Sequence, residues 1–150
     1  MFFIGIDPGV NTGFAVWSGD TQKFLAVATL GITEALSEAL RFVESAGPDN
    51  AAIFFEDARQ RKYLPRERNL SEYRGKLMGA GSVKRDCDIW EEFCTRHAIP
   101  FRAIPPRKGL TKWDADYFAR VTGWKGRTSN HARDAALLVW GQSEKITTKV

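Results

Sequence analysis

Cysteine is scarce in this sequence of 150 residues, and long hydrophobic runs are absent. The two cysteines, Cys87 and Cys94, stand seven positions apart in a helical pattern, too far along one helix to bridge at a rise of about 1.5 Å per residue. They also lack the partner ligands and the spacing of a zinc site. No apolar stretch approaches the roughly 20 residues that a membrane span needs, and Asp7 interrupts the N-terminal apolar run before a signal-peptide core is complete. We therefore expect a soluble protein of the reducing cytoplasm, with no membrane partner.

Internal repeats, low-complexity tracts and linkers rich in Pro, Gly or Ser are also absent. This length is typical of one domain, so we expect a single domain over residues 1–150. Hydrophobic residues make up 43% of the chain, which is enough for a core that needs no disulfide or structural metal.

Charge is unevenly distributed along the chain, although the formal net charge is only +4. Residues 1–58 hold 2 basic and 8 acidic side chains, whereas residues 59–76 and residues 102–127 each hold 7 basic and 2 acidic side chains. Two basic blocks of this kind are a candidate footprint for a polyanion such as nucleic acid. Charge alone is equally compatible with two solvated loops.

Runs of β-branched and aromatic residues that end in turn residues predict five strands. They lie at residues 2–7, 13–17, 23–30, 51–55 and 100–104. Apolar residues at helical spacing predict helices from Ile32, with Thr33 as its N-cap, and over about 71–97, 112–121 and 130–140. The first three strands read as an antiparallel meander and the later strands alternate with helices. We therefore expect an α/β fold with a mixed five-stranded sheet flanked by helices.

Acidic side chains stand at the ends of two predicted strands. Asp7 ends the first strand, and Glu56 ends a short, continuously apolar run that is typical of a central buried strand. His131 and Asp134, three residues apart, share one face of the last predicted helix. Clustered carboxylates repel one another unless a cation neutralises them, so their convergence would point to a divalent metal. Taken one by one, the same residues could be a turn, solvated loop acids and a surface histidine.

A longer ordered set of motifs includes these residues. It begins with Ile4-Gly5-Ile6-Asp7-Pro8-Gly9 and Thr12-Gly13, continues through Glu56, Gly79-Ala80-Gly81, residues 100–105 and Lys112 at the start of a helix, and ends with His131-Ala132-Arg133-Asp134-Ala135-Ala136-Leu137. The set resembles the RuvC-type Holliday junction resolvases, which have the ribonuclease H-like fold. It departs from them in residues 57–76, which are longer, more basic and less apolar, and where Tyr63 is the candidate for the family's aromatic wedge. Short, basic variants of this kind are typical of phage or prophage resolvases acting in a bacterial host.

The resemblance implies a crossover junction endodeoxyribonuclease that cuts four-way DNA junctions as a homodimer and uses Mg²⁺ or Mn²⁺. Its implied active site consists of Asp7, Glu56, His131 and Asp134, with Lys112 close enough to offset charge on the phosphate. Two ions about 3.5–4 Å apart would activate the water and stabilise the leaving oxygen. We predict that Asp7 bridges the ions, Glu56 and Asp134 bind one ion each, and His131 is a ligand or a proton-handling group. Because a nitrogen ligand suits Mn²⁺ better than Mg²⁺, Mn²⁺ should support at least equal activity.

On this interpretation the basic blocks contact the DNA backbone, which gives affinity without sequence reading. The candidate DNA-binding side chains are Arg59, Arg61, Lys62, Tyr63, Arg66, Arg68, Arg74, Lys76, Arg107, Lys108, Lys112, Lys125 and Arg127. Lys112 could instead be one more member of the second basic block. Trp113 and Trp124 could stack on unpaired bases, although packing at the core or its edge is the favoured interpretation. Core, or core plus dimer contact, is also expected for a stripe along the longest helix that consists of Leu77, Val83, Cys87, Trp90 and Cys94.

Other function classes share parts of this pattern. A strand with the form Gly-x-Asp-x-Gly also opens actin-like ATPases and sugar kinases, but these need a second equivalent domain and a further glycine-rich phosphate loop. The chain has room for neither, so no nucleotide cofactor is expected. A nuclease for forks, flaps or RNA–DNA hybrids would share the catalytic residues, and this alternative stays open. A non-catalytic DNA-binding module is disfavoured because all four acidic and histidine positions are intact.

Overall fold

The computed structural model describes residues 1–61, 69–107 and 112–143. Within these residues the strands are β1 (Phe2–Asp7), β2 (Thr12–Ser18), β3 (Lys23–Leu30), β4 (Ala51–Glu56) and β5 (Phe101–Ile104). The α-helices are α1 (Ile32–Ala46), α2 (Leu70–Arg96), α3 (Ala115–Thr122) and α4 (Asn130–Val139), and two short 3-10 helices are η1 (Pro48–Asn50) and η2 (Ala58–Gln60). Each predicted strand is present, with bounds within about one residue of those expected.

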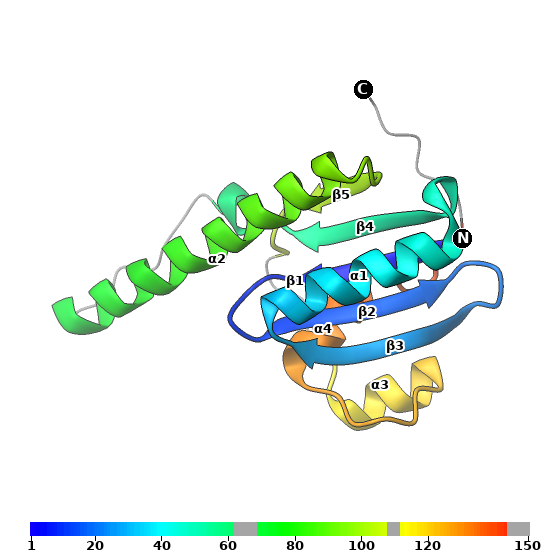
Figure 1. Cartoon of the computed structure of the whole chain (residues 1–150). Coiled ribbons are helices and arrows are strands. Elements are labelled where there is room, and N and C mark those ends of the chain that lie inside the picture. Colours follow the sequence, from blue (N-terminus) through cyan, green and yellow to red (C-terminus); the bar gives the residue numbers. More distant parts are fainter. Residues whose placement is uncertain (62–68, 108–111, 144–150) are drawn as a thin grey trace.

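The strands form one sheet in the order β3-β2-β1-β4-β5. Strands β1, β2 and β3 pair antiparallel, whereas β4 pairs parallel with β1 on one side and with β5 on the other. This confirms the mixed five-stranded sheet, which is that of the ribonuclease H-like fold. Because β1 and β4 run side by side in the same direction, their carboxyl ends lie next to each other at one edge of the sheet (Figure 1).

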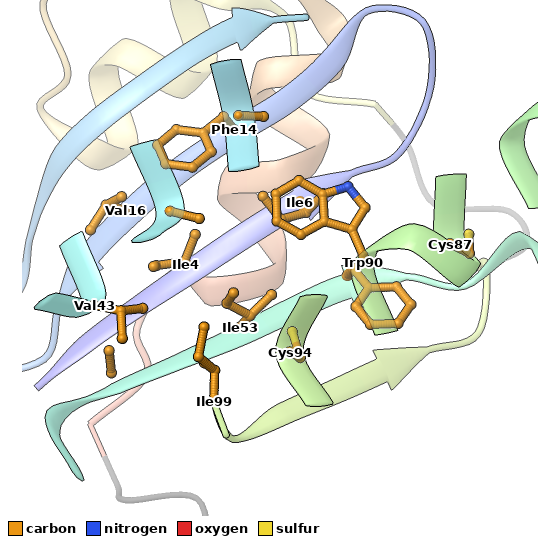
Figure 2. Close-up of a cluster of buried hydrophobic side chains, with 14 residues drawn as sticks. Ile4, Ile6, Phe14, Val16, Val43, Ile53, Cys87, Trp90, Cys94 and Ile99 are labelled. Atoms are coloured by element: carbon orange, nitrogen blue, oxygen red, sulfur yellow. The ribbon is translucent and has the colours of Figure 1, made fainter. Parts of the chain in front are cut away.

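Helices cover both faces of the sheet, which explains why its central strands are continuously apolar. On one face, side chains of β1, β2 and β4 pack against α1 and α2, and Figure 2 shows Ile4, Ile6 and Ile53 gathered beside Trp90 and Cys94. On the other face, Phe3, Ala15, Phe54 and their neighbours pack against α3 and α4. Alternate residues of one strand therefore serve two different cores, and the sheet is held between two helical layers.

Helix α2 extends beyond the edge of the sheet at its N-terminal half (Figure 1). Cys87, Trp90 and Cys94 are fully buried, as the stripe predicted, but Leu77 is exposed and Val83 is only half-buried. The core interpretation is therefore confirmed for the last three members and not for the first two, because that part of the helix has left the sheet surface. A dimer contact at Leu77 and Val83 stays a prediction. Of the helices that the structure describes, none combines the length and apolarity needed to cross a lipid bilayer.

Two predicted helix starts are also wrong. Thr33 lies inside α1, whose N-cap is Gly31 and has no side-chain hydrogen bond. Lys112 precedes α3 rather than opening it, because the Asp114 side chain accepts a hydrogen bond from the Tyr117 backbone N–H and makes Asp114 the N-cap. Lys112 is thus a residue of the connection that leads into α3.

Candidate active site

Two acidic side chains stand at the ends of two central strands of the sheet. Asp7 and Glu56 are the last residues of β1 and β4, and each directly follows the last pair between these two strands, Ile6 and Phe55. Both strands are covered by helices on their two faces, so the carboxylates emerge directly from the core. The Asp7 side chain keeps only 17% of its surface exposed. The ends of the first and fourth strands therefore lie side by side in the sheet.

Helix α4 brings the third acid and the histidine to this edge. Ser129 caps the helix by accepting a hydrogen bond from the backbone N–H of Ala132. In its first turn, His131 places Nδ1 2.9 Å from Oδ2 of Asp7. Asp134 follows three residues later on the same face, which is the arrangement that the helical spacing predicted.

Two glycines make this approach of α4 to the sheet possible. A Cβ atom on Gly13 would lie 1.9 Å from the carbonyl oxygen of His131, and a Cβ atom on Gly5 would lie 2.1 Å from the carbonyl oxygen of Ala135. Real Cβ atoms essentially never come within 3.0 Å of such neighbours. Hydrogen is thus the only side chain that fits at either position, and Gly13 stands opposite Asp7 in the β1–β2 pairing.

Lys112 reaches the same edge from the connection before α3. Its Nζ lies 3.0 Å from Oδ2 of Asp134, and their side chains are 69% and 29% exposed. Next to it in sequence, the carbonyl oxygen of Trp113 accepts a hydrogen bond from Nε of Arg133 at 2.8 Å. Arg133 is only 8% exposed and also donates to Thr128 and Asn130, so it ties the start of α4 to the segment that carries Lys112.

The surroundings of Asp7 and Glu56 are unfavourable to negative charge. Burial raises the pKa of Asp7, and the nearby charge of Asp134 adds to this, while the hydrogen bond and charge of His131 act in the opposite direction. Burial also raises the pKa of Glu56, and the charges of Asp7 and Asp134 raise it further. The acids therefore interact with one another as a cluster, and the charge of Lys112 and the hydrogen bond of His131 to Asp7 partly offset their repulsion.

Asp57, which follows Glu56, has a different role. Its side chain is buried and is bound by Arg59 through Nε at 2.7 Å and Nη2 at 3.0 Å. The same guanidinium contacts Asp88 at 2.8 Å and Glu91 at 2.6 Å, both on α2. These bonds hold the pKa of Asp57 below its usual range against the effect of burial. They fasten the end of β4 to α2, so Arg59 has a structural role that the sequence analysis did not predict, and its contact with DNA stays a prediction.

A cleft of about 440 Å³ opens beside Asp7 and Glu56 and runs along α2. Its apolar lining comes from Pro8, Ala58 and the small or short side chains of α2. Three basic residues complete the lining, and we refer to them as the cleft cations: Arg61, Lys76 and Lys84. Two of them belong to the predicted first basic block, whereas Lys84 was missed because the region around it is nearly neutral in charge.

The remaining predicted DNA-binding residues are spread over the surface or lie outside the described part of the chain. Arg74 and Arg107 are exposed. Lys125 and Arg127 line a separate hollow beside α3, which shares no lining residue with the cleft at Asp7. Outside the described residues lie Lys62, Tyr63, Arg66, Arg68 and Lys108. Trp113 and Trp124 are partly buried against the second core, which confirms the packing interpretation for both.

The oxygen-rich donor set at this edge has the chemistry that a hard divalent cation prefers. Asp7, Glu56 and Asp134 could serve as its ligands. The raised pKa values of Asp7 and Glu56 mean that their ionised forms are disfavoured, and a bound cation would stabilise them. Within residues 1–61, 69–107 and 112–143, however, no three His, Cys, Asp or Glu side chains stand ready assembled around a common point. Instead, one oxygen of Asp7 is turned to His131 and one oxygen of Asp134 is turned to Lys112.

Comparison with known proteins supports the fold. No protein-family model matches this sequence, and no curated protein matches it either. Among solved structures, the chain is similar to T. thermophilus RuvC in complex with a Holliday junction substrate. The two are 18% identical, the alignment covers 94% of this chain and 92% of that chain, and the TM-score is 0.55. At this identity the likeness shows a shared ribonuclease H-like, RuvC-like fold.

Proposed function

We propose that this protein is a divalent-metal-dependent endonuclease that resolves four-way DNA junctions by phosphodiester hydrolysis, with paired symmetrical nicks. The convergence of Asp7, Glu56 and Asp134 with His131 and Lys112 at one edge of the sheet carries the proposal. Acids brought together by β1, β4 and α4 destabilise one another, so their placement is explained by chemistry rather than by folding. Similarity in fold to a RuvC that was solved with a Holliday junction supports the choice of substrate.

Asp7, Glu56 and Asp134 would hold two Mg²⁺ or Mn²⁺ ions, with His131 as a further ligand or as a proton-handling group. When bound, such ions supply an activated water and stabilise the leaving oxygen of the phosphodiester. His131 contributes to proton transfer, because Asp7 fixes its ring through Nδ1 and leaves Nε2 for a proton from solvent. Lys112, whose side chain is mostly exposed, offsets negative charge that develops on the phosphate.

DNA would enter along the cleft that borders Asp7 and Glu56. The cleft cations stand on the α2 side of the carboxylates, where they can contact phosphates on either side of the scissile bond. Arg74, Arg107, Lys125 and Arg127 extend the basic surface away from the cleft. This arrangement gives affinity that depends on backbone charge and not on base sequence.

Paired cuts in a four-way junction need two active sites related by symmetry, so we propose that the protein acts as a homodimer. Leu70 and Met78 on the projecting half of α2 are 63% and 78% exposed, and exposed apolar side chains of this kind support a surface that a second copy covers. We further propose that it acts in the bacterial cytoplasm as a phage or prophage variant, on the strength of its short chain and first basic block.

The substitution Asp7→Asn tests the catalytic assignment. It keeps the size of the side chain but removes the charge that the proposed ions need, and we expect the nicking rate on a four-way junction with Mg²⁺ to fall about 100-fold or more. Asp49→Asn is the matched control, because Asp49 is an exposed acid in η1, which precedes β4 at the end of that strand opposite Glu56, and its rate should equal that of the wild type. Wild-type nicking by Asp7→Asn would refute the assignment.

A further inference from the structure

Asp134 forms an ion pair with Lys112 in this structure. The Nζ atom of Lys112 lies 3.0 Å from Oδ2 of Asp134, and no other basic side chain of the described residues forms an ion pair with this carboxylate. Asp7 and Glu56 face the same edge and add negative charge to it. The charges of Asp7 and Glu56 also act on this ammonium group.

The contact is built into the fold, although the lysine side chain itself is mostly exposed. Arg133, the neighbour of Asp134, holds the carbonyl oxygen of Trp113, the neighbour of Lys112, at 2.8 Å. Arg133 is nearly fully buried and has further hydrogen bonds to Thr128, so this backbone link has little freedom. Two adjacent residues on each side are thus locked in register, which places the Lys112 side chain within reach of Asp134. Asp114 and Asp116 line the same hollow as Lys112, but among the described residues its ion pair is with Asp134.

We propose that Lys112 is the resident counter-cation of Asp134, that it competes with a divalent ion for this carboxylate, and that it is freed to face the substrate phosphate when the ion is bound. The inference rests on the proposed function, because it takes Asp134 as a metal ligand. It also accounts for the finding that no three potential ligands among the described residues are assembled around a common point.

The physical reason is simple competition between like charges. An ammonium group and a divalent ion on one carboxylate repel each other over a few ångströms, so one weakens the binding of the other. A partly exposed ion pair is weak enough to be displaced, and its remaining attraction is still sufficient to lower metal affinity. Removing the charge of Lys112 should therefore strengthen metal binding while it weakens catalysis, and these opposite directions distinguish the proposal from a purely catalytic role.

The test measures Mn²⁺ binding to the full chain without DNA, by isothermal titration calorimetry, for the wild type and Lys112→Met. We expect the variant to bind Mn²⁺ about three- to tenfold more tightly. Lys112→Arg, which keeps the charge, should bind as the wild type does. Lys23→Met is the matched control, because Lys23 is an exposed lysine at the start of β3 whose removal changes the net charge by the same amount.

A double-mutant cycle assigns the effect to the Lys112–Asp134 pair. In the Asp134→Asn background, Lys112→Met should no longer tighten Mn²⁺ binding. Equal affinities of the wild type and Lys112→Met, the same gain in Lys23→Met, or no measurable Mn²⁺ binding in any variant would each overturn the proposal. If the wild type does not cut junctions and Lys112→Met still binds Mn²⁺ more tightly, the competition is supported and the proposed nuclease function is refuted. The two failures are therefore distinguishable.

Discussion

The closest approach of backbone to backbone at the site predicts the effect of one added methyl group. In Gly13→Ala the new Cβ would lie 1.9 Å from the carbonyl oxygen of His131, whereas ordinary contact begins at 3.4 Å. The overlap is therefore about 1.5 Å, the difference between 3.4 Å and 1.9 Å. The Cβ atom is bonded to the backbone, and the carbonyl oxygen is part of it. A side-chain rotation cannot relieve it. Either β2 or the first turn of α4 must move.

The magnitude follows from this displacement. Extra atoms in a well-packed interior cost about 1–3 kcal/mol and occasionally more, and we expect Gly13→Ala to lie at about 3 kcal/mol because backbone atoms have to shift. The first turn of α4 carries His131, whose Nδ1 is 2.9 Å from Asp7. Since a misplacement of about 1 Å at a catalytic group can cost about 100-fold in rate, the nicking rate should fall by at least that factor.

Urea denaturation at pH 7 and single-turnover nicking of a four-way junction measure the two effects. Gly81→Ala is the matched control, because a Cβ atom there meets nothing within 4 Å and Gly81 lies inside α2. The control should gain about 0.5–1 kcal/mol of stability from the better helix propensity of alanine and keep its rate. A Gly13→Ala protein with wild-type stability and wild-type rate would refute the packing argument.

Three further predictions concern charge. Arg59→Met should lower the unfolding free energy at pH 7 by about 2–4 kcal/mol, because it leaves Asp57 buried without its partner. The folded-state pKa of Asp57 lies below its usual value, so the stability that this pair contributes is present above about pH 4 and is lost as the pH falls through that pKa. In urea denaturation, the free energy of unfolding should therefore differ less between pH 7 and pH 3 in Arg59→Met than in the wild type. The folded-state pKa of Asp7 is raised, so the charge of Asp7 lowers the stability of the protein as the pH rises. In EDTA at pH 7, Asp7→Asn should therefore melt at the wild-type temperature or above it. A clearly lower melting temperature would contradict this. Binding to a four-way junction should weaken with salt, with a slope of log K against log salt of about −3 or steeper if the three cleft cations contact phosphates, and a flat dependence would exclude them.

Much of the site follows from local sequence signals. Asp7 and Glu56 end apolar runs, and such runs locate buried strands without reference to the rest of the chain. His131 and Asp134 are placed on one face by helical spacing alone. The alternation of strands with helices predicts parallel pairing in the second half of the chain, which the β4–β5 pair confirms, but it does not predict which strand lies beside β1.

The features that the sequence did not predict depend on contacts between segments far apart in the chain. Arg59 is in a basic block by composition, and its ion pair with Asp88, 29 residues away on α2, could not be predicted from the local sequence. Leu77 repeats the helical spacing of the core, yet α2 has passed the edge of the sheet there. Arg133 offers the one overlooked signal, since a lone arginine beside an apolar run must find hydrogen-bond partners when it is buried. Gly13 gave no comparable signal, because only the position of α4 shows what a side chain would meet.

The most direct test of the central claim is the cleavage pattern of the purified protein on four synthetic DNAs, namely a four-way junction, a Y-fork, a flap and a linear duplex, each with Mg²⁺ and with Mn²⁺. The account predicts paired, symmetrically placed nicks in the four-way junction alone, with Mn²⁺ at least as effective as Mg²⁺. Cleavage of the fork or the flap in preference to the junction would move the substrate assignment to another branched DNA. An absence of metal-dependent nicking in all four would contradict the account.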